Sequence, residues 1–310
     1  MTTGSGRLEA TPAHSRNWVL TLSALAALLA PSMCAAQAPA LESQDVQSSY
    51  SVTRAAESEK GLTLSAFYGG SFFAHQHVTE IDGTVGYNFN DHVGVDFGVP
   101  AYFVGASRVF DSPAGPITRN FGVNGIGNVY TELLINSIGT PVLYLGTFRV
   151  SAPTGNTRTG FSTGRVTYDL DNYFDHDFGR LRPFADVGLA NSIADTQFFY
   201  RPFVTLGTVI LSEAGASFRV IRHARVGASL YDDAPIGTQK VFSRINGSQM
   251  TGPARIDRDN GYSGWVTVSP TSFLVLQAGY DHSVRYAYNV FSFGVGVDVK
   301  QAYRKARTSF

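Results

Sequence analysis

Hydrophobic and polar residues alternate with a period of two over much of the chain, and the clearest run lies at 286–299. Successive side chains leave an extended backbone on opposite faces, so this period predicts a β-strand. One face of the run is bulky and apolar, whereas the other carries small or polar residues, among them Gly294, Gly296 and Asp298. This contrast is typical of a strand that meets lipid on one side and a crowded aqueous lumen on the other.

The same alternation recurs along the chain and predicts about twelve strands of roughly 9–13 residues, long enough to cross a bilayer at a tilt. The runs lie at 61–69, 81–89, 93–101, 121–135, 144–151, 166–171, 183–190, 203–222, 226–230, 265–269, 274–280 and 286–299. No amphipathic helix of useful length separates them, which argues against an α/β fold. The sequence therefore predicts an all-β fold, an antiparallel up-and-down transmembrane β-barrel.

Short turns and longer loops alternate between these runs. The short ones lie at Asn90, 136–139, 177–179, 223–224 and 270–271, and the longer ones at 73–77, 105–118, 153–160, 192–200 and 233–261. Outer-membrane barrels have short periplasmic turns and longer outer loops. The link at 283–285 departs from this rule, because it is short where a long loop is expected. An even strand count places both ends of the barrel in the periplasm.

A soluble sandwich or lipocalin-like barrel predicts the same period. In a soluble barrel, however, the bulky residues fill the interior and the outside carries Lys and Glu. The polar face of these runs has too few lysines to be a solvent-facing surface. The membrane barrel is therefore the favoured reading of the pattern.

Composition bears on which classes of partner the protein could bind. Charged residues make up only 15% of the chain and the formal net charge is zero, whereas soluble domains average about 25% charged residues. No basic excess exists to neutralise phosphates, so nucleic acid is not expected as a partner.

The N-terminus has the order of a secretory signal: basic residues, an apolar run at 18–30, and small residues up to Ala36. We expect residues 1–36 to be a signal peptide; a single N-terminal membrane anchor is the alternative. Cleavage after Ala36 removes Cys34, the single cysteine of the chain. Residues 37–60 are then a polar periplasmic tail or a plug, 61–299 the barrel, and 300–310 a basic C-terminal tail.

Charged and polar residues gather on the inner face of the predicted barrel. The lumen-lining candidates are Asp82, Asp96, Glu132, Arg149, Arg165, Asp169, Asp186, Arg219 and Tyr288, with Asp171, Glu213, Gln277 and Asp298 on the same face. Such charges either brace the wall as a structural network or select what crosses. Alternation alone leaves both readings open, because it predicts facing and not height along the barrel.

The histidines give weak support for an enzyme or a metal site. The run Asp281-His282-Ser283 holds three residue types of a hydrolase triad, but neighbours on a strand point to opposite faces. His75 and His77 have no evident third metal ligand. We therefore expect no enzymatic activity, no metal and no cofactor.

Two glycine-rich segments carry a family resemblance. Residues 125–128 (Gly-Ile-Gly-Asn) and 152–155 (Ala-Pro-Thr-Gly), followed by Gly160 and 162–164 (Ser-Thr-Gly), resemble the outer-membrane transporter family named for the phenol-degradation meta pathway. This family is distantly similar to the long-chain fatty-acid channels of outer membranes. Asn128 stands where the family has Asp. The resemblance implies passive uptake of small hydrophobic or aromatic compounds.

Together these patterns predict an outer-membrane channel of a Gram-negative bacterium for small hydrophobic or aromatic compounds. Its expected partners are outer-membrane lipid, the barrel-assembly machinery and small apolar solutes. The alternative is a barrel that does not transport and has a structural or surface-interaction role through its extracellular loops, such as 233–261.

Overall fold

The computed structural model describes residues 60–302, apart from 74–75, 111–116, 138–141, 193–202, 244–247, 254 and 256–257. The predicted signal peptide, residues 37–59 of the predicted tail and residues 303–310 lie outside the described residues. So does His75, one member of the His pair.

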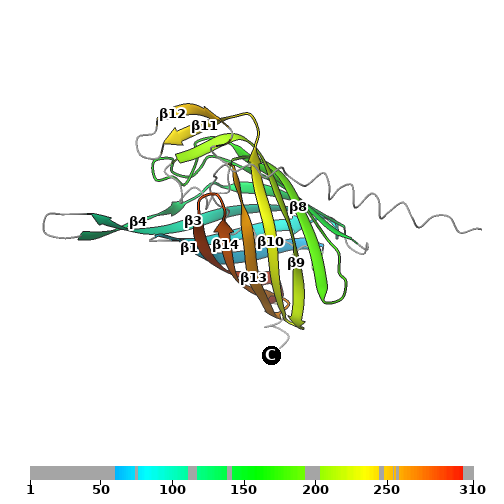
Figure 1. Ribbon diagram of the computed structural model, residues 1–310. Coiled ribbons are helices and arrows are strands. Elements are labelled where there is room, and N and C mark those ends of the chain that lie inside the picture. Colours follow the sequence, from blue (N-terminus) through cyan, green and yellow to red (C-terminus); the bar gives the residue numbers. More distant parts are fainter. Residues whose placement is uncertain are drawn as a thin grey trace, which may run out of the picture. The chain divides into compact units, whose positions relative to one another are not determined.

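Twelve of the described strands form a closed antiparallel ring in which each strand pairs with its two neighbours (Figure 1). The ring consists of β1 (Gly61–Phe73), β2 (Gln76–Asn88), β3 (Val93–Phe110), β5 (Tyr130–Ser137), β6 (Leu143–Ser151), β7 (Thr167–Asp175), β8 (Leu181–Ser192), β9 (Phe203–Ile221), β10 (Ala224–Pro235), β13 (Asp259–Thr271), β14 (Leu274–Ser283) and β15 (Tyr288–Asp298). The predicted transmembrane barrel of about twelve strands is thereby confirmed.

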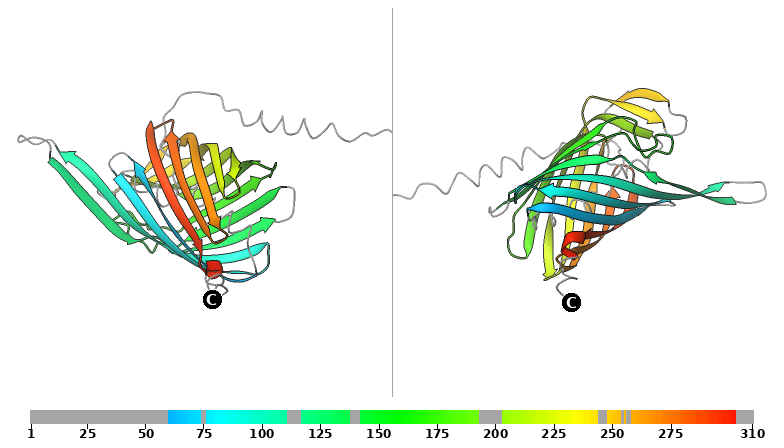
Figure 2. Two further views of the ribbon diagram at one scale, coloured as in Figure 1. Left: turned by 90° about the horizontal axis from the view of Figure 1, so that it is seen from below. Right: turned by 180° about the vertical axis from the view of Figure 1, so that it is seen from behind.

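The last strand closes the ring against the first. β15 pairs with β1 from Ser65 opposite Asp298 to Phe72 opposite Phe291. Figure 2 shows this pairing as red strands beside blue ones. Closure satisfies the backbone groups that an open sheet edge would leave unpaired, which is a strict requirement inside a bilayer.

The two faces of the wall differ as the alternation predicts. Large apolar side chains cover the outside and are freely accessible; Leu62 is 60% exposed and Phe291 is 59% exposed. Polar side chains fill the inside, where Asp96 is only 1% exposed. An outer belt of exposed Leu, Val, Ile and Phe suits lipid and not water.

Three further described strands extend the ring on the side of the long loops. β4 (Ile117–Ile126) pairs with the far end of β3, while β11 (Thr238–Ser243) and β12 (Gln249–Pro253) form a hairpin attached to β9. Figure 1 shows β3 and β4 continuing as a two-stranded ribbon past the ring. In the described part of the chain, no helix is long and apolar enough to cross a membrane.

The pattern predicts one strand at 121–135, but the structure divides it into β4 and β5. Three residues, Gly127 to Val129, stand opposite only Val99 and Pro100 of β3. Pro100 has no backbone N–H for the ladder, and its carbonyl oxygen accepts a hydrogen bond from Gly127 N at 2.8 Å. The extra residue makes a bulge that turns the strand at this point.

Candidate lumen constriction

A cluster of buried apolar side chains lies inside the barrel on the side of the long loops. Val78 of β2, Tyr102 of β3 and Val290 of β15 face inward and form one cluster with Phe161, which is 1% exposed. The rings of Tyr102 and Phe161 stack with their centroids 6.0 Å apart and their planes inclined by 4°. Phe161 comes from the connection between β6 and β7. We call this connection, residues 152–166, the inward segment.

The bulge between β4 and β5 holds the inward segment against the wall. Asn128 Oδ1 accepts a hydrogen bond from Gly155 N at 3.2 Å. Thr154 Oγ1 accepts one from Val129 N at 2.8 Å. Asn128 is 0% exposed. The amide that stands where the resembled family has Asp is therefore a buried anchor for the inward segment.

Three motif glycines make this close packing feasible. A Cβ atom at Gly125 would lie 2.8 Å from the Phe161 ring, one at Gly127 would lie 2.5 Å from the Tyr102 ring, and one at Gly155 would meet Phe161 O at 2.2 Å. All three distances are shorter than a van der Waals contact. The glycines therefore serve the contact between the inward segment and the inner wall.

On the turn side of the apolar cluster, charged side chains form a belt on the inner wall. Asp96 of β3, Glu132 of β5, Arg149 of β6 and Asp169 of β7 are cross-strand partners in one continuous row. Arg149 Nη2 lies 2.7 Å from Glu132 Oε2, and its Nε donates a hydrogen bond to the same oxygen at 2.7 Å. Its guanidinium also lies 4.2 Å from the Tyr130 ring centroid, close enough for a cation–π contact.

Asp82 joins this belt through Tyr130, whose hydroxyl donates a hydrogen bond to Asp82 Oδ2 at 2.5 Å. Asp82 is 2% exposed and Tyr130 is 5% exposed. Further around the ring, Asp186 of β8 stands directly opposite Glu213 of β9. The belt thus contains several carboxylates around Arg149, which makes this guanidinium central to its electrostatic balance.

The remaining candidates lie elsewhere. Arg219 lies near the turn side of the barrel and pairs with Asp177 at 3.0 Å, and Arg182 lies 3.6 Å from the same carboxylate. Arg165, predicted to lie on the inner face, belongs to the inward segment and is exposed, two residues before β7 begins at Thr167. Tyr288 begins β15, but its side chain lies outside what the structure describes.

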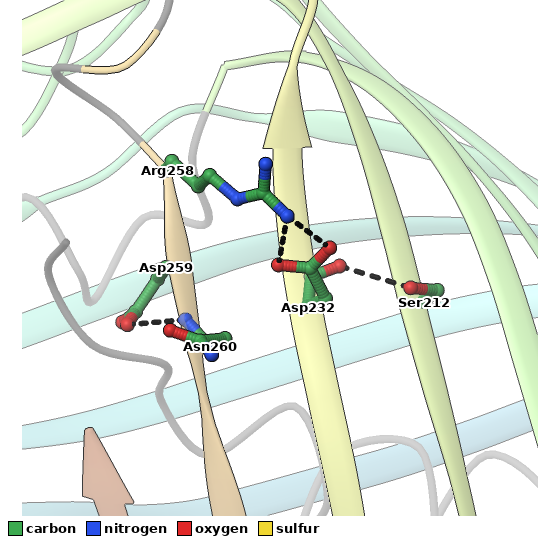
Figure 3. A network of polar contacts seen from close by, with 5 residues as sticks. All are labelled: Ser212, Asp232, Arg258, Asp259 and Asn260. Atoms are coloured by element: carbon green, nitrogen blue, oxygen red, sulfur yellow. Dashed lines mark hydrogen bonds and ion pairs between the residues drawn. The ribbon is translucent and has the colours of Figure 1, made fainter. Parts of the chain in front are cut away.

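A polar network occupies the wall of the barrel on the side of the long loops. Arg258 donates to both carboxylate oxygens of Asp232 at 3.3 and 3.0 Å, and Ser212 Oγ donates to Asp232 O at 3.0 Å (Figure 3). Asp259, which is 0% exposed, accepts hydrogen bonds from Asn260 N at 2.6 Å and Ser283 Oγ at 2.9 Å. These contacts fix β10 against β13 at their loop ends.

Within the described residues, His282 does not meet its sequence neighbours Asp281 and Ser283 in one cluster. His282 Nδ1 lies 2.7 Å from Asn289 Oδ1, while Asp281 and Ser283 are buried on the opposite face. Among the described residues, no group of three or more His, Cys, Asp or Glu side chains is placed to hold a metal ion.

Sequence reasoning missed several aromatic residues of the lumen, among them Phe161, Tyr173, Phe184 and Trp265. Phe184 and Trp265 occupy the inward positions of β8 and β13, where the pattern otherwise places small or polar residues. That break in the alternation was the available signal. Phe161 lies between strands, so no periodic signal marks it.

Comparison with known proteins identifies the fold. No protein-family model matches the chain, and no curated protein matches it. Among solved structures, an outer membrane channel from Pseudomonas putida F1 is similar with a TM-score of 0.52 at 13% identity, over 77% of this chain and 96% of that chain.

Two other barrels match less well. The NanC porin has a TM-score of 0.45 at 9% identity, over 76% of this chain and 99% of that chain. A FadL homologue from Pseudomonas aeruginosa has a TM-score of 0.39 at 9% identity, over 79% of this chain and 92% of that chain. Scores this low carry no functional argument. The fold is that of an outer-membrane β-barrel, and its apolar outer belt places it in the outer membrane.

Proposed function

We propose that this barrel is a channel for the passive entry of small hydrophobic or aromatic compounds across the outer membrane. The observation that carries the proposal is the apolar cluster of Phe161, Tyr102, Val78 and Val290 inside the lumen. The interior of an outer-membrane barrel is ordinarily polar. An apolar constriction favours solutes that gain from leaving water at that point.

The position of the motifs supports the same proposal. The two segments that resemble the meta-pathway transporter family, 125–128 and 152–155, meet at the constriction through Asn128, Gly155 and Thr154. Residues that resemble a transport family therefore lie against the apolar cluster inside the barrel. We infer that the chain is a transporter of this kind.

The proposal is tested by solute flux into vesicles that carry the purified protein and have a lipopolysaccharide outer leaflet, which slows spontaneous crossing. Benzyl alcohol is expected to enter these vesicles faster than protein-free vesicles. The rate of xylose entry is expected to rise much less. Equal acceleration of both solutes would indicate an open aqueous pore. No acceleration of either would contradict the channel.

The alternative role, a surface-interaction barrel without transport, has one feature in its favour. The β11–β12 hairpin and the β3–β4 ribbon extend the sheet beyond the closed ring on the side of the long loops. Such extensions offer surface to an external partner. The absence of flux in the vesicle experiment would favour this role.

A further inference from the structure

The lumen contains a second aromatic group, on the turn side and separate from the constriction. Tyr173 of β7 and Phe184 of β8 stack with ring centroids 5.6 Å apart and an interplanar angle of 21°. Phe184 in turn contacts Trp265 of β13 with centroids 5.6 Å apart and an interplanar angle of 63°. Tyr173, Phe184 and Trp265 form the lower aromatic row.

This row crosses the inner wall over two strands, β9 and β10, whose inward residues at this point have no side chain. β9 and β10 separate β8 from β13 in the ring, and their inward positions at this height are Gly215, opposite Phe184, and Gly227, opposite Trp265. A Cβ atom at Gly227 would lie 2.4 Å from the indole ring. The wall is thus built to let the indole lie across it and reach Phe184.

The three rings are not fully covered. Trp265 keeps 9% of its surface exposed, and Tyr173 and Phe184 are half-buried on the inner face. Aromatic surface that faces an aqueous lumen gains free energy when another apolar face covers it. A flat aromatic molecule matches the stacked and edge-on orientations that the row already contains.

Carboxylates border the row on one side. Asp186 lies two residues beyond Phe184 on the same face of β8, which corresponds to about 7 Å along a strand, and stands opposite both Tyr173 and Glu213. The Oδ1 atom of Asp186 is buried without a hydrogen-bond partner within the described part of the structure. It is an acceptor placed beside the aromatic surface.

On the other side of the row lie two cations: Arg182, which carboxylates already engage, and Arg225, two residues before Gly227 on the same face of β10, whose Nη1 is buried without a hydrogen-bond partner among the described residues. Arg182, two residues before Phe184, lies 3.5 Å from Asp175 and 3.6 Å from Asp177. An anionic solute over the rings would therefore have Arg225 on one side but would meet Asp186 and Glu213 on the other. The carboxylate side of the row favours a neutral molecule that donates a hydrogen bond.

We propose that Tyr173, Phe184 and Trp265 form a binding subsite in the turn-side half of the lumen for a planar aromatic molecule with a hydrogen-bond donor, which Asp186 accepts. The subsite rests on the proposed channel function and assigns it a solute class, aromatic amines and hydroxyl compounds. A solute passing the constriction would bind here before it leaves the barrel.

Trp265 is also the reporter of its own site, since the chain has two tryptophans and Trp18 lies in the predicted signal peptide. In the purified full mature protein, 4-nitroaniline is expected to quench the Trp265 fluorescence saturably; W265F provides the background. F184L is expected to weaken this binding by between about twofold and tenfold, whereas F291L on the lipid face is expected to leave it unchanged.

The donor and the charge are tested with matched probes. D186N is expected to weaken the binding of 4-nitroaniline roughly tenfold or more. It is expected to weaken the binding of nitrobenzene, which has no hydrogen-bond donor, much less. In the unsubstituted protein, 4-nitrobenzoate is expected to bind most weakly of the three probes. Quenching that does not saturate, or that is unaffected by F184L, would overturn the subsite. Saturable quenching without vesicle flux would support the subsite and contradict the channel. Vesicle flux without saturable quenching would support the channel and contradict the subsite.

Discussion

Replacing Arg149 by Met is expected to destabilise the barrel by about 2–4 kcal/mol. Arg149 is the cation between Glu132 and Asp169 in the charged row, and it makes the ion pair with Glu132 at 2.7 Å. Its removal leaves Glu132, Asp96 and Asp169 facing one another without a balancing charge. The expected cost is below that of a fully buried pair, because the Arg149 side chain is 28% exposed.

The measurement is reversible unfolding in lipid vesicles at neutral and at acidic pH. The loss of stability in Arg149→Met is expected to shrink as the pH falls, because protonation removes the repulsion among the remaining carboxylates. The double variant with Glu132→Leu is expected to recover part of the loss, since it also removes a carboxylate. A single variant as stable as the wild type at neutral pH would show that Arg149 does not brace the wall.

Replacing Ile81 by Arg is expected to cost about 2–4 kcal/mol, the penalty for a cation on the lipid face near the midplane. Ile81 lies near the middle of β2 and is 44% exposed on the outer face. The loss should appear in the free energy of unfolding in vesicles and as a smaller fraction of folded, heat-modifiable protein on gels.

Thr84→Arg provides the matched control within the same strand. Thr84 faces inward, and its hydroxyl lies 3.4 Å from the Tyr130 hydroxyl, near the carboxylates of the belt. An arginine there gains favourable charge contacts and is expected to be tolerated better than one at position 81. Equal losses at the two positions would contradict the assigned facing of β2.

Alternation was sufficient to predict the wall of this barrel. Facing follows directly from a period of two, so the bulky face of the run at 286–299, which includes Phe291, lies on the outside as predicted. The pairing of the last strand with the first follows from closure. The division of 121–135 was missed, although Pro100 on the neighbouring strand was a signal for an interrupted ladder. Bulges depend on the partner strand, which the pattern of one strand does not encode.

The interior was predicted less well, for physical reasons. The period of two places Asp82 and Glu132 on one face of the wall. It does not predict that Tyr130 donates a hydrogen bond to Asp82 or that Arg149 forms an ion pair with Glu132. The inward segment has no period at all, so its path into the lumen depends on tertiary contacts of Asn128 and Phe161. That the predicted charged residues line a transport path stays a prediction. The inward aromatic residues are further candidates for lining that path.

The central claim, that the inward segment narrows the path with Phe161, is tested most directly by the flux of benzyl alcohol and xylose through Phe161→Ala. Truncation removes the ring that stacks on Tyr102, so both solutes are expected to enter faster and the preference for benzyl alcohol is expected to fall. Phe291→Ala, the same change on the lipid face, should leave both rates unchanged. Wild-type rates and wild-type preference in folded Phe161→Ala would contradict the account.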